Sequence, residues 1–243
     1  MATYVIFGDG RVGVNMASYL EHLGHDVSLL SHEQANENQS DCEMLIEQAD
    51  IVAAAIPDDK LKTWHDQWSA VIGEKITVHF SGAVIIDGMY GFHPLYSFPK
   101  YVLPIETMQE IAFACPLGGP SFGDVFPFAS NPNFEIADCD RARYHALAVL
   151  SGNLVGYIWN ETAKEFAEFS DMPSEKLLEN YLTSIVERFV ENPTASLTGP
   201  IARHDEVTVK ENLSALAGNA KLKGLYVAFL TAAWPDFETT GQS

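Results

Sequence analysis

A short apolar strand pattern that runs directly into three glycines constrains this chain more than any other feature. Residues 4–7 read YVIF, and Gly8, Gly10 and Gly13 follow with the spacing G-x-G-x-x-G. In a strand–turn–helix unit the first glycine allows the turn, the second lets a pyrophosphate approach the backbone, and the third packs the helix on the strand. The segment therefore predicts a dinucleotide-binding loop. The alternative is a similar turn that no longer binds a ligand.

The first half of the chain alternates strand-like and helix-like patterns, which is typical of a parallel sheet with flanking helices. Ser40 and Glu43 have the spacing of a capping box, so we expect a helix there after a polar loop at 33–39. The predicted strands are 4–7, 26–30, 51–56, 76–80 and 111–115, and the predicted helices are 12–23, 40–48 and 61–72. We predict an α/β Rossmann-like parallel sheet.

The second half changes to helical periods. Segment 116–132 is rich in Gly, Pro and Ser, so we place a domain boundary there, with a dinucleotide-binding domain at 1–130 and an all-α domain at 131–243. Thr208 and Glu211 form a second capping-box pattern ahead of an apolar helix. About 100 helical residues bury little surface alone. We therefore expect this domain to pack on the first one or on a second copy of the chain, as a homodimer.

Charge and cysteine content exclude several classes of partner. The 243 residues carry 14 Lys and Arg against 33 Asp and Glu, a formal charge of −19, which repels nucleic acid and anionic lipid. Three scattered cysteines predict neither a disulfide framework nor a metal site, and they fit a reducing cytoplasm. No apolar run is long enough to suggest a membrane span. We expect a cytoplasmic protein without a bound metal.

The residues around the glycine loop bear on which nucleotide binds. Asp9 places a carboxylate near the expected phosphates and should weaken binding, unless Arg11 neutralises it. The second predicted strand ends in Ser31 and His32 without an acidic residue, which favours NADP over NAD; Glu33 is the residue that would reverse this preference. The predicted cofactor-binding residues are Gly8, Asp9, Gly10, Arg11, Val12, Gly13, Ser31, His32, Ile56, Pro57, Ser81 and Gly82.

Six segments in a fixed order carry a resemblance to a known family. They read GDGRVG, ADIVAAAIPDD, HFSGA, FHPLYSF, YHALAVLSGN and LTGPIARHDEVTVKENLSAL. Over nearly the whole chain they resemble uncharacterised Rossmann-like proteins with a helical C-terminal domain of unknown function, the DUF2520 type. These are distant relatives of 6-phosphogluconate dehydrogenase, pyrroline-5-carboxylate reductase and ketopantoate reductase. The resemblance implies an NADP-binding fold with a dimer-forming helical domain, and it implies no substrate.

Three residues are candidates for the chemistry of hydride transfer, which needs a group that gives or takes a proton. His93 lies just past the loop at 81–83, in an extended FHP segment, and is the first candidate for proton donor. His145 and Asn153 lie two helical turns apart, so both can face the same cleft. Each histidine can instead have a purely structural role. The catalytic Lys that 3-hydroxyacid dehydrogenases of this fold carry four residues before the Asn is replaced by Val149.

The segment TGPIARHDE supplies candidate substrate contacts. Its Gly-Pro turn presents Thr198 and Arg203, and the guanidinium of Arg203 can hold a carboxylate or phosphate through paired hydrogen bonds. A salt bridge with Asp205 or with a partner subunit is the alternative role. The sequence thus predicts an NADP-dependent oxidoreductase for a small, anionic carbonyl, imine or hydroxy acid. The alternative is a nucleotide-binding or sensor protein on the same fold that has no catalytic activity.

Overall fold

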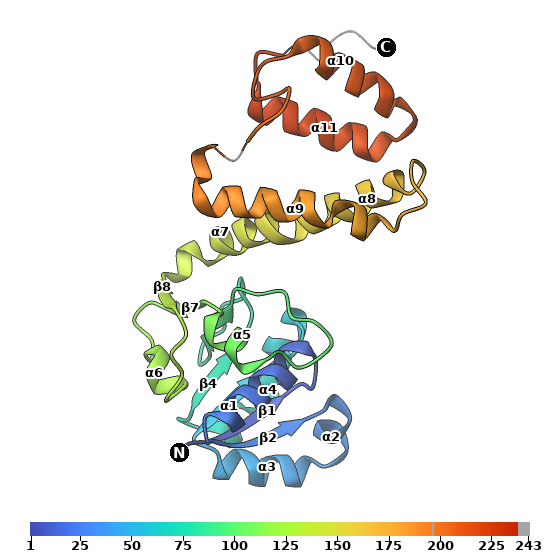
Figure 1. Ribbon diagram of the computed structural model, residues 1–243. Coiled ribbons are helices and arrows are strands. Elements are labelled where there is room, and N and C mark those ends of the chain that lie inside the picture. The colour runs from blue at the N-terminus through green and yellow to red at the C-terminus, as the bar shows by residue number, and fades with distance from the viewer. Residues whose placement is uncertain (196, 238–243) are drawn as a thin grey trace. The chain divides into compact units, whose positions relative to one another are not determined.

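A parallel sheet with the strand order β2-β1-β3-β4-β5 forms the centre of the first structural unit, residues 1–152 (Figure 1). The structure is a computed structural model and describes residues 1–195 and 197–237. The strands are β1 (Thr3–Phe7), β2 (Asp26–Leu30), β3 (Ile51–Ala54), β4 (Ile76–His79) and β5 (Tyr90–Gly91). The predicted Rossmann-like sheet is therefore confirmed.

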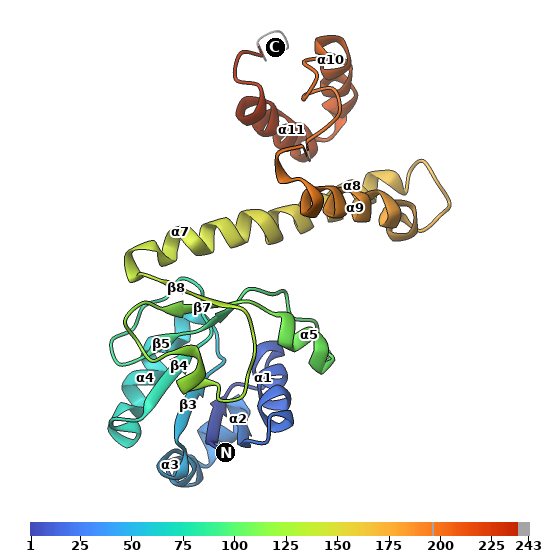
Figure 2. The same ribbon diagram turned by 60° about the vertical axis from the view of Figure 1, so that its left-hand side comes forward.

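Side chains of each central strand alternate between two apolar cores. In β1, Tyr4 and Ile6 pack in one core, and Val5 and Phe7 pack in the other. The first core includes residues of α1 (Arg11–His22) and α5 (Ile105–Glu110), and the second includes residues of α3 (Gln39–Gln48) and α4 (Asp58–Ile72). Figure 2 shows α1 and α4 on opposite sides of the sheet. Burial on both faces explains why these strands read as continuous apolar runs.

A second, smaller sheet completes the first unit. Its strands are β6 (His93–Pro94), β7 (Phe113–Pro116) and β8 (Asn133–Ile136); β6 is antiparallel to β7, and β8 is parallel to it. Helix α6 (Phe122–Val125) precedes β8, and α7 (Asp138–Ala148) follows it. Because β8 pairs with β7, the first unit extends to residue 152, whereas the boundary predicted from the sequence lies at 130.

Two predicted helix starts are wrong. A helix, α2 (His32–Glu37), occupies most of the predicted polar loop, because Ser31 and Gln34 form a reciprocal capping box. The predicted box at Ser40 does not form; α3 begins at Gln39 without a side-chain cap. In the second half, α10 begins at Glu206 rather than after Thr208, since the Asp205 carboxylate accepts a hydrogen bond from the Thr208 amide.

The second unit, from Asn153 onward, is helical. A π-helical segment, Val149–Leu154, includes its first two residues, and its helices are α8 (Val155–Phe166), α9 (Ser174–Glu191), α10 (Glu206–Ala215) and α11 (Ala220–Ala233). Short 3-10 turns follow α9 and α10, at Pro193–Ala195 and Leu216–Gly218. A small core joins α10 and α11 and includes Ile201, Val209, Leu213 and Leu230. Within 1–195 and 197–237, no helix combines the length and apolar character needed to cross a bilayer.

Candidate active site

In the turn between β1 and α1, a side chain would collide with the backbone at two of the three glycines. At the third, a side chain would meet no protein atom. Gly8 has φ of +106°, and a Cβ there would lie 2.4 Å from the Ala55 carbonyl oxygen. A Cβ on Gly13 would lie 1.8 Å from the Gly8 carbonyl oxygen. Around Gly10 a Cβ would meet nothing within 4 Å, and its backbone is extended, with φ of −71°. The open space at Gly10 is thus available to a group outside the chain.

A cavity of about 500 Å³ opens beside this turn at the carboxyl ends of β1, β2 and β3. Ligands of doubly wound sheets bind at this edge. The cavity is lined by Phe7, Gly8, Asp9, Gly10, Ser31, His32, Ala35, Asn36, Ala55, Ile56, Pro57, Lys60, Thr63, Trp64, Gln67 and Trp68. Seven of the predicted cofactor residues are among them: Gly8, Asp9, Gly10, Ser31, His32, Ile56 and Pro57. Arg11, Val12, Gly13, Ser81 and Gly82 do not line it.

Asp9 is not neutralised by Arg11 in the described part of the chain. The Asp9 side chain is exposed at the cavity, whereas Nη1 of Arg11 donates a long hydrogen bond, 3.5 Å, to the Phe98 carbonyl oxygen. Among the described residues, the Asp9 carboxylate thus lies beside the glycine turn without an ion pair to Arg11. Glu33, the other acidic residue that bears on nucleotide choice, is exposed and does not line the cavity.

Lys60 and Trp64 line the cavity and are absent from the predicted site. They lie on α4, which begins directly after the Ile56-Pro57 segment of the predicted site. Helical spacing places residues 60, 64 and 67 on one side of α4, so the periodicity of this helix was a usable signal. Lys60 pairs with the neighbouring Asp59 at 3.1 Å, with both side chains largely exposed.

A second cluster forms around the loop after β4. Oγ of Ser81 donates a hydrogen bond to Oδ2 of Asp58 at 2.7 Å, and it accepts hydrogen bonds from the amides of Ala83 and Val84. This contact joins the loops that follow β3 and β4. Asp58 is the first residue of α4, whose N-cap is Pro57.

Gly82 allows two histidines to approach the chain closely. A Cβ at this position would lie 2.7 Å from a ring carbon of His145 and 3.1 Å from a ring carbon of His93. The two imidazole centroids are 6.1 Å apart. The structure thus brings together Gly82, His93 and His145, three residues that the sequence assigns to the site from separate segments.

His93 has a partner that sequence reasoning missed. Its Nδ1 lies 2.7 Å from the hydroxyl oxygen of Tyr144 on α7, within hydrogen-bond distance. Burial, followed by the charges of His145 and Arg141, lowers the pKa of His93 to about 4, and burial raises the pKa of Tyr144. At neutral pH the pair therefore consists of a neutral imidazole and a protonated phenol.

The lowered pKa values of buried histidines predict that the folded protein loses stability in acid. Burial also lowers the pKa of His79 to about 4, so the unfolded chain binds protons near pH 6.5 that the folded chain does not. We expect the free energy of unfolding to fall as the pH decreases from about 6.5 to about 4. Urea unfolding across this range measures the slope, which His93→Gln should reduce, with the exposed His22→Gln as control. An unchanged slope in His93→Gln contradicts the shift.

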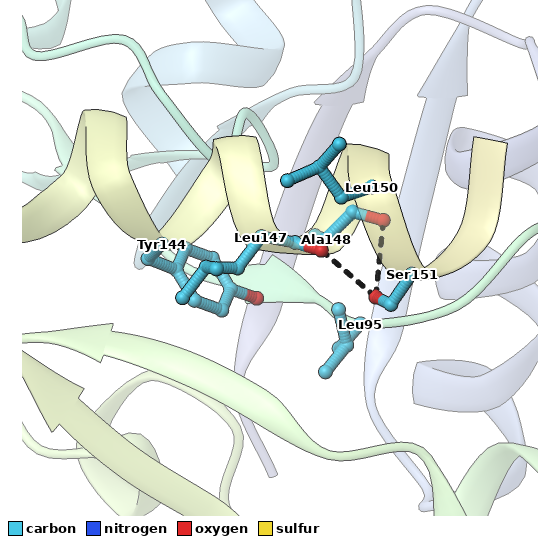
Figure 3. A pocket seen from close by; sticks show the side chains of 6 residues that line it. All are labelled: Leu95, Tyr144, Leu147, Ala148, Leu150 and Ser151. Carbon is cyan, nitrogen blue, oxygen red and sulfur yellow. Dashed lines mark hydrogen bonds between the residues drawn. The ribbon is translucent and has the colours of Figure 1, made fainter. Parts of the chain in front are cut away.

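Tyr144 also lines an apolar pocket of about 520 Å³, shown in Figure 3. Its other lining residues are Leu95, Leu147, Ala148, Leu150 and Ser151. The Ser151 hydroxyl donates hydrogen bonds to the carbonyl oxygens of Leu147 and Ala148, at 2.9 and 3.3 Å (Figure 3). The serine hydroxyl thus bonds to its own helix, and the Tyr144 hydroxyl is bonded to His93.

Three predicted site residues belong to the second unit. Asn153 is exposed at its start, and Thr198 accepts a hydrogen bond from Nη1 of Arg188 at 3.4 Å. Arg203 is exposed, and its charge contributes to lowering the pKa of Asp205, behind the hydrogen bonds from Thr208. Their roles toward a substrate stay predictions.

Comparison with known proteins supports the fold. Among the matching structures are a candidate NADP oxidoreductase from Bacteroides fragilis, with 18% identity, TM-score 0.73 and coverage of 96% of this chain and 97% of that one. Protein TM1727 from Thermotoga maritima matches with 19% identity, TM-score 0.69 and coverage of 95% and 96%. Plasmodium falciparum pyrroline carboxylate reductase, solved with NADP bound, matches with 13% identity, TM-score 0.60 and coverage of 96% and 95%.

Comparison at the level of sequence matches only part of the chain. No curated protein matches the chain. Residues 124–232 match a domain of unknown function, DUF2520. At these identities the structural matches establish the fold and no specific activity. The chain thus contains a DUF2520 domain, and its fold is a Rossmann-like parallel sheet followed by helices, as in the matching structures.

Proposed function

We propose that this protein is an NADP-dependent oxidoreductase that transfers hydride to or from a small carbonyl, imine or hydroxy acid. The observation that carries the proposal is the 500 Å³ cavity beside Gly10, where the protein leaves open the space that a pyrophosphate needs. The structural neighbours that carry NADP in the same fold support the choice of cofactor.

The residues around the cavity fit a dinucleotide. The amides at the start of α1 would hold the pyrophosphate, since no side chain caps this helix. Ala35, Ile56 and Trp64 supply apolar surface for a flat base. The buried indole Nε1 of Trp64 finds no hydrogen-bond partner among the described residues, so the wall of the cavity has a donor to offer. Asp9 opposes the phosphates and should weaken binding.

The same cavity favours NADP over NAD. Ser31, His32 and Lys60 line it, so a ribose 2′-phosphate would meet a hydroxyl, an imidazole and an ammonium group. A ribose 2′-hydroxyl would need an acidic acceptor, and Glu33 lies outside the lining. Lys60 would therefore supply a cation for the 2′-phosphate.

The chemistry of the reaction is divided between the cofactor and the protein. The nicotinamide supplies or accepts the hydride when the cofactor is bound. Neutral His93 is poorly suited to donate a proton as an imidazolium, so we assign the proton to the Tyr144 hydroxyl and give His93 the role of orienting it. The apolar pocket beside Tyr144 would hold the carbon skeleton of the substrate.

Assembly and location belong to the same proposal. Helix α9 exposes large apolar side chains, among them Tyr181, Val186, Phe189 and Val190, which fits the proposed homodimer of the helical domain. Cys42, Cys115 and Cys139 are free thiols, which is compatible with a reducing cytoplasm. Thr198 and Arg203 stay candidates for contacts with an anionic substrate.

A nucleotide titration tests the proposal. We expect NADPH to raise the melting temperature of the purified protein, since a ligand that binds only the folded state stabilises it by about 2.7 kcal/mol at a hundred times its Kd. Lys60→Gln should weaken NADPH binding about tenfold, the loss of one charge-assisted contact, and leave NADH binding unchanged. Lys62→Gln, on the same helix but outside the cavity lining, is the matched control.

The outcomes separate the candidate functions. Stabilisation by NADPH, together with its oxidation in the presence of one member of a panel of carboxylated ketones and imines, supports the enzyme. Stabilisation without oxidation across the panel favours the sensor protein without catalytic activity. If neither NADPH nor NADH shifts the melting temperature or binds in calorimetry, the proposal is wrong.

A further inference from the structure

Arg141 on α7 is a fully buried cation without a close carboxylate partner. The residue is 1% exposed. Its Nη2 donates a hydrogen bond to the Gly91 carbonyl oxygen, and its Nε lies 3.9 Å from the carboxylate of Asp138, whose side chain is 67% exposed. Nη1 is buried and has no hydrogen-bond partner within the described residues. Because an uncompensated buried charge is strongly destabilising, this guanidinium requires a further acceptor.

A cavity of about 200 Å³ lies against this side chain. It is formed by the chain at 84–91, the loop at 116–119 and the first turn of α7, all within the first unit. Only glycine at position 91 leaves room for the guanidinium, since a Cβ there would lie 2.8 Å from Nη1 of Arg141. The cavity shares no lining residue with the nucleotide cavity.

The start of α7 adds a second feature that attracts anions. This helix has 11 residues, and its N-cap, Ala137, provides no side-chain hydrogen bond to the first turn. Uncapped amides and the helix dipole give this end a partial positive charge next to the cavity. His79 also lines the cavity and is neutral at pH 7, because burial lowers its pKa to about 4. Arg141 therefore supplies the full positive charge.

From the buried Nη1, the cavity and the helix terminus, we infer that this site binds a small monoanionic carboxylate. The carboxylate oxygen would accept a hydrogen bond from Nη1, completing the partners of the guanidinium. Asp87 and Asp138 line the same cavity and repel a dianion such as phosphate more than a monoanion. The inference does not rest on the proposed function, since the site requires no nucleotide.

Acetate is the probe that tests this site. The full chain, without nucleotide, is titrated with sodium acetate at constant ionic strength set with sodium chloride. Calorimetry measures the affinity, and ¹⁵N NMR follows the Arg141 side chain and the Gly91 amide. We expect saturable binding in the millimolar range that shifts both signals. Asp138→Asn removes an opposing charge and should bind acetate about threefold to tenfold more tightly.

Two further variants test whether acetate binds at Arg141. Asp140→Asn removes a carboxylate from the same turn of α7 but outside the cavity lining, so its affinity should equal that of the wild type. Arg141→Gln should abolish binding. Absence of saturation, an equal response to chloride, or binding that persists in a folded Arg141→Gln overturns the inference. Should Arg141→Gln fail to fold, equal affinities of the two aspartate variants overturn it instead.

Discussion

Replacing Gly13 with Ala is expected to destabilise the protein by about 3 kcal/mol or more, whereas replacing Gly10 with Ala leaves the fold intact and weakens nucleotide binding. The contrast follows from the space around each glycine. A Cβ at position 13 would collide with the Gly8 carbonyl oxygen at 1.8 Å, and the backbone atom cannot move without breaking the β1–α1 turn. A Cβ at position 10 meets no protein atom within 4 Å.

The measurement for this pair is urea unfolding of both variants, followed by NADPH calorimetry on Gly10→Ala. We expect the affinity of Gly10→Ala for NADPH to fall by at least about tenfold, or about 1.4 kcal/mol, because the methyl group occupies the position of the pyrophosphate. Gly24→Ala fails as a control because Gly24 has φ of +84°, whereas Gly152→Ala is suitable, since a Cβ there meets nothing within 4 Å. Unchanged NADPH binding by a folded Gly10→Ala would show that no phosphate lies at this turn.

Tyr144→Phe is expected to lower kcat by about 10²- to 10⁴-fold, the range for loss of a positioned general acid. The substitution removes only the hydroxyl that lies 2.7 Å from Nδ1 of His93, and the ring continues to pack beside the apolar pocket. The Kd for NADPH should be unchanged, because Tyr144 does not line the nucleotide cavity. Single-turnover oxidation of NADPH, with the substrate that the panel identifies, measures the effect.

His93→Gln provides the companion variant. Its amide can still form a hydrogen bond with Tyr144, so we expect a smaller loss of kcat than for Tyr144→Phe. Tyr157→Phe, an exposed tyrosine of the second unit, serves as the control for loss of a phenol. A larger loss in His93→Gln than in Tyr144→Phe would transfer the proton-donor role to His93, as the sequence alone suggests.

The glycine turn shows how much of this protein the sequence specifies locally. The strand at β1, the turn at Gly8 and the start of α1 were all predicted, because the apolar period and the positive φ of Gly8 depend on a few adjacent residues. The predicted helix 61–72 ends at the same residue as α4, whose C-cap, Gly73, has φ of +62°. The same local reasoning failed at α2, where Ser31 and Gln34 cap a helix inside a segment that composition made look like a loop.

The site was predictable only in pieces. The sequence identified Gly82, His93 and His145 separately, but their approach to within contact distance depends on pairing between β6 and β7 and on the position of α7. Tyr144, Lys60 and Arg141 were missed, since each gains its importance from partners 50 or more residues away or from a cavity wall.

By itself, then, the sequence determined the strands β1 to β4, the helices α1, α3 and α4 that alternate with them, and the glycine loop, because turn chemistry and hydrophobic period act over neighbouring residues. Only the tertiary structure decided which polar side chains are buried away from solvent and which residues from distant segments come into contact. The charge state of His93 and the unsatisfied guanidinium of Arg141 are products of that burial, and burial is a property of the packed fold rather than of any local sequence pattern.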